Sequence, residues 1–447
     1  MTTNFKFIHA ADIHLGSNLH IRQKLNKDLM KIIDSAVYDS FERIFNFAVS
    51  EKVNFILLSG DIYDRDSRSV KANSFFVKQC SRLKNENIDV FIVGGNHDPV
   101  KESSEYFKLP SNVHIFSPEK AEIFELKDYK QYVYCRVIGQ SYRDTWDSRK
   151  IFENYKMVND NIFTIAMLHT QLDKTNNYIP CTFSDLKAID NIDYWALGHI
   201  HKPQVINREA PTAIYPGIPQ GRDSGEEGIG GAVLLEVAEN NIIEIKLMKT
   251  SPIIWKNVSI NINDYDIKNL SDLENIIINR IEELTSKEKD KLHSFNCIYH
   301  ESWSLTNGYI INLNIAGRGD IYAYINDKEE EAGDALIENL NIKLLNNHPF
   351  IYVNSIEFYV GKPIEAYEQL LKDNEMIKTI DLITQKCIDD EALKIQLTKK
   401  LGVIWEETKD IEDVNIKKLQ LDEETYEAIV SQAKKLIIDL LLERHDN

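Results

Sequence analysis

Cysteine is scarce and long apolar runs are absent in this sequence of 447 residues. The five cysteines lie far apart and form no C-x-x-C pair, which excludes a disulfide framework and a cysteine zinc site and favours a reducing cytoplasm. No stretch approaches the roughly 20 consecutive apolar residues of a membrane-spanning helix. The first residues show no basic segment followed by an apolar one, so we expect no secretory signal.

The sequence also lacks the net positive charge typical of nucleic-acid-binding proteins, since its formal charge is −18. The acidity is uneven. Residues 1–250 carry 30 basic and 33 acidic side chains, a net of −3, whereas 251–360 and 361–447 have nets of −8 and −7. Acidic bulk weakens non-specific binding to phosphates, but it leaves room for a local positive site in the first 250 residues.

Length and apolar pattern predict three regions, because a domain takes about 150 residues. In residues 1–250, apolar runs of strand length alternate with helical patterns, which indicates an α/β domain. Residues 251–361 predict a small α+β cap domain, and residues 362–447 predict a helical, acidic tail. The expected elements of the first region are strands at Phe5–Ala11, Phe55–Ser59, Val90–Val93, Phe163–Leu168, Tyr194–Leu197 and Gly228–Val237, and helices at Leu29–Val49 and Val70–Leu83.

Polar clusters follow five of these strands. They are Asp12-Ile13-His14, Gly60-Asp61-Ile62-Tyr63-Asp64, Gly95-Asn96-His97-Asp98, Leu168-His169-Thr170 and Gly198-His199-Ile200-His201. Loops at the same ends of neighbouring parallel strands converge, so these side chains can meet in one pocket. Carboxylate and imidazole groups are good ligands for Mn²⁺, Fe²⁺ and Zn²⁺. A single cluster of this kind is usually accidental, and a lone histidine after a strand usually serves packing. Five clusters in order at strand ends predict a metal site.

The ordered clusters resemble the signature of the calcineurin-like metallophosphoesterase superfamily. Asp12-x-His14-Leu15-Gly16 and Gly94-Gly95-Asn96-His97-Asp98 are similar to motifs of the SbcD-type DNA repair exonucleases, in particular their YhaO branch. The resemblance covers residues 5–237 and is weaker beyond them. It implies a four-layer sandwich, with two central β-sheets flanked by helices, which carries the cap domain and the tail.

The resemblance also implies a site with two divalent ions, most favourably Mn²⁺. One ion would be held by Asp12, His14, Asp61 and His201, and the other by Asp61, Asn96, His169 and His199. Asp61 would bridge the two ions, which would polarise a phosphodiester and supply the attacking hydroxide.

The family further implies that His97 assists the leaving oxygen. We expect Asp64 to orient His97; the alternatives are that Asp64 caps the helix starting near Ser67–Val70, or that Asp98 is the orienting group.

These residues predict a metal-dependent phosphodiesterase or exonuclease that acts on DNA in repair, with an SbcC-type coiled-coil ATPase as partner and a homodimer as a plausible state. One alternative is a metallophosphoesterase for cyclic nucleotides, other small phosphoesters or phosphoproteins. Another is a weakly active or non-catalytic scaffold at DNA ends. Arginines beside the motifs are candidate phosphate contacts, and three aromatic residues are candidates for stacking on bases, although core packing is the commoner role. The arginines are Arg65, Arg68 and Arg222, and the aromatics are Tyr63, Tyr142 and Trp146.

The tail carries apolar residues at helical spacing, which predicts two amphipathic helices. One candidate is Ala366–Cys387, and the other runs from Tyr426 to Leu441. The same periodicity suits docking on the ATPase and packing of the helices on each other, and both possibilities stay open.

Overall fold

The computed structural model describes residues 4–22, 25–64, 69–100, 107–175, 177–286, 296–298, 305–326, 328–361, 363, 375–400 and 423–445. The chain divides into two compact units. The first comprises Met1–Ser259, Glu274–Asn314 and Gly333–Glu357, and the second comprises Ile260–Leu273, Ile315–Ala332 and Phe358–Asn447. The three regions expected from the sequence have other bounds than these two units and remain a prediction.

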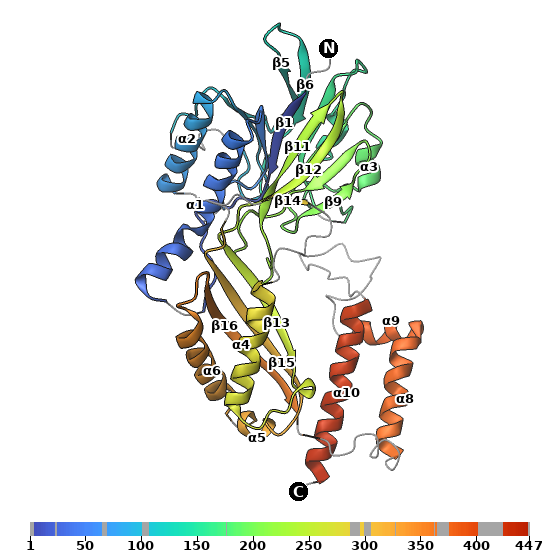
Figure 1. Ribbon diagram of the computed structural model, residues 1–447. Helices are drawn as coiled ribbons and strands as arrows, with labels where there is room; N and C mark the ends of the chain where they lie inside the picture. The colour runs from blue at the N-terminus through green and yellow to red at the C-terminus, as the bar shows by residue number, and fades with distance from the viewer. Residues whose placement is uncertain are drawn as a thin grey trace. The chain divides into compact units, whose positions relative to one another are not determined.

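Two mixed β-sheets form the centre of the first unit (Figure 1). The first sheet has the order β14-β12-β11-β1-β2-β3-β4, in which β1 to β4 are parallel and β11 is antiparallel to β1. Its strands are β14 (Asn296–Ile298), β12 (Asn241–Lys249), β11 (Gly231–Ala238), β1 (Phe5–Ala10), β2 (Phe55–Ser59), β3 (Asp89–Val93) and β4 (Val113–Ile115). The second sheet has the order β5-β6-β7-β8-β10-β9, with β6, β7, β8 and β10 parallel. Its strands are β5 (Glu122–Lys127), β6 (Val133–Gly139), β7 (Phe163–His169), β8 (Tyr194–Gly198), β10 (Thr212–Tyr215) and β9 (Gln204–Asn207).

Alternation of side chains along the strands separates the core into layers. On β2, Ile56 and Leu58 pack against helices α1 (Lys27–Ser50) and α2 (Val70–Asn85). Phe55 and Leu57 of the same strand face the second sheet. The far side of the second sheet packs on the short helices η1 (Ile151–Asn154) and α3 (Phe183–Lys187). The four-layer sandwich predicted from the sequence is therefore confirmed.

The remaining elements follow β12. A three-stranded sheet has the order β13-β15-β16. Its strands are β13 (Ile253–Asn261), β15 (Gly308–Arg318) and β16 (Phe350–Gly361). The helices of this part are η2 (Ile262–Asp264), α4 (Leu270–Ser286), α5 (Tyr322–Ile325), α6 (Glu329–Leu344), α8 (Glu375–Asp389), α9 (Glu391–Lys400) and α10 (Glu423–His445). Among the described residues, no helix is both long and apolar enough to cross a membrane.

The tail helices α8 and α10 pack on each other within the second unit. Tyr426 and Ile438 of α10 are buried, whereas Leu436 and Ile437 are exposed. The predicted helix at Ala366–Cys387 is described only from Glu375, and its first part lies outside the described residues.

Candidate metal centre

The five polar clusters lie at the carboxyl ends of strands from both central sheets. Asp12 follows β1, Asp61 follows β2 and Asn96 follows β3, all in the first sheet. His169 is the last residue of β7, and His199 follows β8, in the second sheet. The two sheets therefore supply opposite walls of one site.

The backbone of the site is held in an unusual conformation. Asp12, His14, Asp61 and His199 have φ angles of 53°, 48°, 53° and 99°. This left-handed region costs a non-glycine residue about 1–3 kcal/mol, and such residues cluster at functional sites. The loops are fastened by backbone bonds from Asp12 N to Gly60 O and from His14 N to Asp61 O, both of 3.0 Å. The fold thus maintains strain that turns these side chains toward the site.

Two glycines allow the walls to approach closely. A Cβ on Gly198 would lie 1.9 Å from Ser59 O, and a Cβ on Gly95 would lie 2.2 Å from Asp61 Oδ1. No real Cβ tolerates such distances, so residues at these positions must lack a side chain for Asp61 and the β2 backbone to sit where they do.

The first group of ligand atoms comes from Asp12, His14 and His201, which all lie within 4.8 Å of one another. The Nε2 atoms of His14 and His201 face each other at 3.3 Å, and Asp12 Oδ1 lies 3.9 Å from His201 Nε2. Burial lowers the pKa of His14 to about 3, so its imidazole is neutral and offers a lone pair.

The second group comes from Asp61, His169 and His199, and Asn96 joins it. The Asn96 Oδ1 atom lies 2.9 Å from His169 Nε2 and 3.0 Å from His199 Nδ1. His169 Nε2 is also 3.3 Å from Asp61 Oδ2. Burial lowers the pKa of His199 to about 3, which keeps this ring neutral as well.

The outer nitrogens of two imidazoles fix their tautomers. His169 Nδ1 donates to Ser59 O at 2.9 Å, and His201 Nδ1 donates to Glu226 Oε1 at 2.6 Å, because a carbonyl or carboxylate oxygen can only accept. In the neutral rings, both Nε2 lone pairs then face the interior of the site. Metal-bound histidines almost always make this kind of outer bond.

The donor set fits divalent cations. His169 Nε2 and His199 Nδ1 converge with the oxygens of Asn96 and Asp61, and when both nitrogens are unprotonated these acceptors repel one another unless positive charge lies between them. Burial alone would lower the pKa of His169, but the adjacent Asp61 carboxylate outweighs burial and raises this pKa to about 9. The second group of ligands therefore favours a positive charge. The structure thus brings together the residues of both predicted ligand sets. The bridging role of Asp61 stays a prediction.

His97 lies beside the first group, with its ring 4.9 Å from that of His14. Its Nδ1 atom is 2.9 Å from Asp64 Oδ1, and this hydrogen bond raises the pKa of His97. The side chain that caps α2 is that of Ser69, so the capping alternative for Asp64 is wrong. Asp98 instead accepts backbone N–H bonds, including one of 2.7 Å from Ile62, and so braces the loop. Of the two carboxylates considered as orienting groups, Asp64 is the one that bonds to the His97 ring.

Glu226 is a site residue that the sequence did not reveal. Its carboxylate accepts from His201 Nδ1 and from the backbone and guanidinium of Arg222, at 2.6 Å for Oε2 to Arg222 N and 2.9 Å for Oε1 to Nη2. Arg222 Nη1 also lies 3.8 Å from Asp64 Oδ2. Arg222 and Glu226 therefore link the group around His201 to the Asp64–His97 pair. No residue pattern marks Glu226, because its role depends on how residues 221–228 fold.

The other candidates have different positions. Tyr63 and Tyr142 are buried, and the Tyr142 hydroxyl donates to His169 O at 2.8 Å, so both serve the core. Trp146 is 56% exposed. Arg65 and Arg68 lie outside the described residues.

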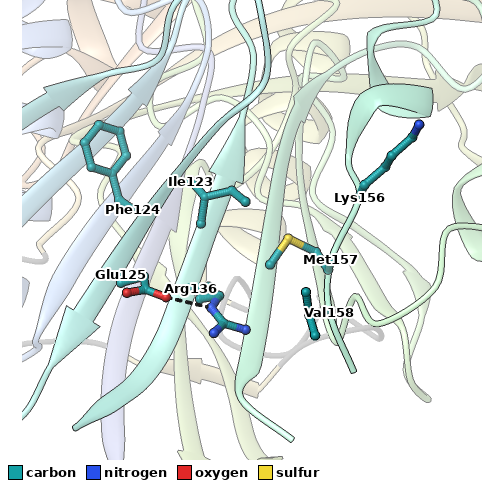
Figure 2. A pocket seen from close by; sticks show the side chains of 7 residues that line it. All are labelled: Ile123, Phe124, Glu125, Arg136, Lys156, Met157 and Val158. Atoms are coloured by element: carbon teal, nitrogen blue, oxygen red, sulfur yellow. Dashed lines mark hydrogen bonds and ion pairs between the residues drawn. The ribbon is translucent and has the colours of Figure 1, made fainter. Parts of the chain in front are cut away.

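A shallow pocket of about 500 Å³ lies elsewhere, on β5, β6 and residues 156–158 (Figure 2). Its Arg136 is engaged by Glu125 at 3.1 Å and by Asp160 at 2.7 Å. The pocket shares no residue with the two ligand groups, and we assign it no function.

Comparison with known proteins identifies the family. A model of the calcineurin-like phosphoesterases matches residues 5–203. The uncharacterized metallophosphoesterase YhaO of Bacillus subtilis is 34% identical over 297 residues, which cover 64% of this chain and 70% of YhaO. The chain therefore belongs to the calcineurin-like phosphoesterases and is a metal-dependent hydrolase of phosphoesters.

Its relatives also include proteins named for DNA repair, as the sequence motifs predicted. The DNA double-strand break repair protein Mre11 of Archaeoglobus fulgidus is 25% identical over 232 residues, which cover 47% of this chain and 49% of that protein. The D component of the nuclease SbcCD of Bacillus subtilis is 22% identical over 291 residues, which cover 56% of this chain and 72% of that protein. The chain thus spans about half the length of this Mre11 relative.

Proposed function

We propose that this protein is a Mn²⁺-dependent DNA nuclease that hydrolyses phosphodiester bonds with two metal ions. The observation that carries the proposal is the adjacency of two groups of buried and partly buried carboxylate and imidazole ligands to an accessible His97 paired with Asp64. The names of the Mre11 and SbcCD relatives favour DNA as the substrate. The near-neutral charge of residues 1–250 is compatible with a local phosphate-binding site.

The residues that would hold the two ions fall into the same two groups of ligands. Asp12, His14 and His201 would hold one ion, Asn96, His169 and His199 the other, and Asp61 would contact both. When bound, such ions offset negative charge on the phosphoryl oxygens and lower the pKa of an attacking water. The set of ligands suits Mn²⁺, since it contains oxygen and imidazole donors and no thiolate.

The chain's own groups complete the reaction. The Nδ1–H of His97 donates to Asp64, so in the protonated ring the Nε2–H points away from Asp64 and can pass its proton to the departing sugar oxygen. The raised pKa of His97 increases the protonated fraction near neutral pH. The Arg222 guanidinium is fixed by Glu226 beside this pair and can contact a phosphoryl oxygen.

The tail offers a surface for an SbcC-type ATPase partner. Leu382 and Ile383 of α8 and Leu436 and Ile437 of α10 are exposed, although these helices pack on each other. Exposed apolar residues on paired helices suit docking of a coiled coil. The name of the SbcCD relative, which is a subunit of a nuclease, favours a partner subunit for this chain.

The test is cleavage of end-labelled linear DNA by the purified chain with Mn²⁺, beside Mg²⁺, EDTA and His97→Ala controls. A cyclic nucleotide and a small phosphodiester are run in parallel. We expect DNA degradation that needs Mn²⁺ and is lost in His97→Ala, while that variant still binds metal. Hydrolysis of the small diesters with intact DNA would contradict the proposed substrate and leave the phosphoesterase site standing.

A further inference from the structure

An aromatic stack leads from the metal centre to the surface of the first unit. The Trp146 ring lies 6.4 Å from the Tyr178 ring at an interplanar angle of 25°, and Tyr178 lies 4.8 Å from the His199 imidazole at 35°. Tryptophan is usually well buried, yet Trp146 is 56% exposed. An exposed indole is therefore placed two rings from a residue of the second ligand group.

The stack is held firmly by its backbone. Residues 147 and 178 form a parallel β-bridge, with bonds of 3.0 Å from Asp147 N to Asn177 O and 2.7 Å from Ile179 N to Asp147 O. The Asp147 carboxylate is buried and accepts from Arg149 Nε at 2.8 Å. Ile179 is fully buried in the core. Two separate loops are thus joined so that the rings of Trp146 and Tyr178 lie next to each other at a small interplanar angle.

The chemistry around the stack favours a flat, uncharged group over a phosphate. Arg143 and Lys174 lie three and four residues along the chain from Trp146 and Tyr178. Both are engaged by acids, Arg143 by Glu119 at 2.7 Å and Lys174 by Asp185 at 3.4 Å. What the stack offers is an aromatic face. Any of the nucleobases can stack on such a face, because each has a flat aromatic ring.

We propose that Trp146 and Tyr178 bind the base of a nucleotide next to the scissile phosphate. With the phosphate at the ligand groups, the adjoining base extends toward His199 and meets the stack. This inference rests on the proposed nuclease function and adds a subsite that favours unpaired or frayed ends, since a paired base must first be unpaired and unstacked, at a cost of a few kcal/mol. Contacts to the sugar-phosphate backbone of DNA alone would give no preference for a base at that position.

The test compares single-stranded oligonucleotides that carry either all their bases or one abasic site, moved along the strand. Binding is followed by fluorescence anisotropy in Ca²⁺, and cleavage in Mn²⁺, for wild type, Trp146→Ala and Trp146→Phe. Tyr129→Ala, which removes an 87% exposed ring from the β5–β6 turn, is the matched control.

We expect Trp146→Ala to weaken binding of intact strands by roughly 5- to 150-fold, with Trp146→Phe close to wild type and Tyr129→Ala unchanged. One abasic position should weaken wild type equally, and that loss should vanish in Trp146→Ala. Hydrolysis of a small diester without a ring should be the same in all variants.

The outcomes separate this inference from the proposed function. Equal losses for Trp146→Ala on intact and abasic strands, or no loss, would overturn the stacking site even if DNA is cleaved. A base-dependent loss of binding without DNA cleavage would support the stacking site and overturn the nuclease. Absence of DNA binding in wild type would overturn both.

Discussion

Glu226 offers a sharp test of the site, because its carboxylate accepts hydrogen bonds from both His201 and the partly buried Arg222. It accepts from His201 Nδ1 at 2.6 Å and from Arg222 at three nitrogens, between 2.6 and 3.3 Å. Glu226→Ala would remove the bond that fixes the tautomer of His201. It would also leave the Arg222 guanidinium, whose side chain is 15% exposed, without this partner.

The magnitude follows from these contacts. Loss of the group that orients a metal-bound histidine typically lowers metal affinity 10- to 100-fold, or about 1.4–2.7 kcal/mol. Removing the carboxylate also breaks charge-assisted hydrogen bonds worth about 1.5–3 kcal/mol of stability. We expect Glu226→Gln to lose less of both, because its amide oxygen can still accept from one of the two partners.

Titration calorimetry with Mn²⁺ measures the affinity, and thermal unfolding monitors the fold. Glu227→Ala is the matched control, since Glu227 is an exposed neighbour and its substitution changes the net charge equally without removing the bond to His201. The double variant Glu226→Ala/Arg222→Ala removes the guanidinium that has lost its Glu226 partner and should regain stability without regaining Mn²⁺ affinity. Equal Mn²⁺ affinity of Glu226→Ala and Glu227→Ala would refute the reasoning.

Three further predictions concern other parts of the chain. Gly198→Ala places a Cβ 1.9 Å from Ser59 O and should lower the free energy of unfolding by about 3 kcal/mol or more, as measured by thermal unfolding. Gly319→Ala is the control and should lower it far less, because its Cβ would meet Ile262 at an ordinary 3.5 Å. Equal losses for the two variants would contradict the close packing at Gly198. Burial lowers the pKa of His9 to about 3 from an unfolded value of 6.5, so the unfolded chain takes up the proton first. The folded state, which holds His9 neutral, therefore loses no stability through this residue above pH 6.5, and loses up to about 1.4 kcal/mol per pH unit between pH 6.5 and pH 3. In EDTA, the melting temperature of His9→Gln should therefore fall less steeply with acid than that of wild type. Parallel curves for the two proteins would refute this. Truncation near Gly361 should leave hydrolysis of a small diester intact and abolish pull-down of an SbcC-type ATPase, and undiminished pull-down would exclude the tail as the docking surface.

The strands and their polar ends could be predicted because the signal is local. The run Phe55–Ser59 is a strand with the predicted bounds, and Phe163–Leu168 extends by one residue to include His169. A buried central strand has apolar side chains on both faces, so its end is visible in the sequence where Asp61 begins.

The division of these strands between two sheets could not be predicted, because pairing is a long-range property. β1 to β3 belong to one sheet and β7 and β8 to the other. Short strands such as β4 and β9, with three and four residues, and the half-exposed β12 carry too weak a pattern to be recognised.

The same limit explains Glu226 and the tail. The contact between Glu226 and His201 spans 25 residues and depends on the loop that carries Arg222. The apolar stripe of α10 was visible in the sequence, but periodicity does not say which face packs on α8. Tyr426 is buried and Leu436 is exposed, although both belong to the predicted stripe.

The central claim is that two ions share this site. Crystals soaked in Mn²⁺ and measured at the manganese absorption edge test it most directly. The account predicts two anomalous peaks about 3.5–4 Å apart, one against Asp12, His14 and His201 and one against Asn96, His169 and His199, with Asp61 between them. A single peak, or two peaks away from these side chains, would contradict it.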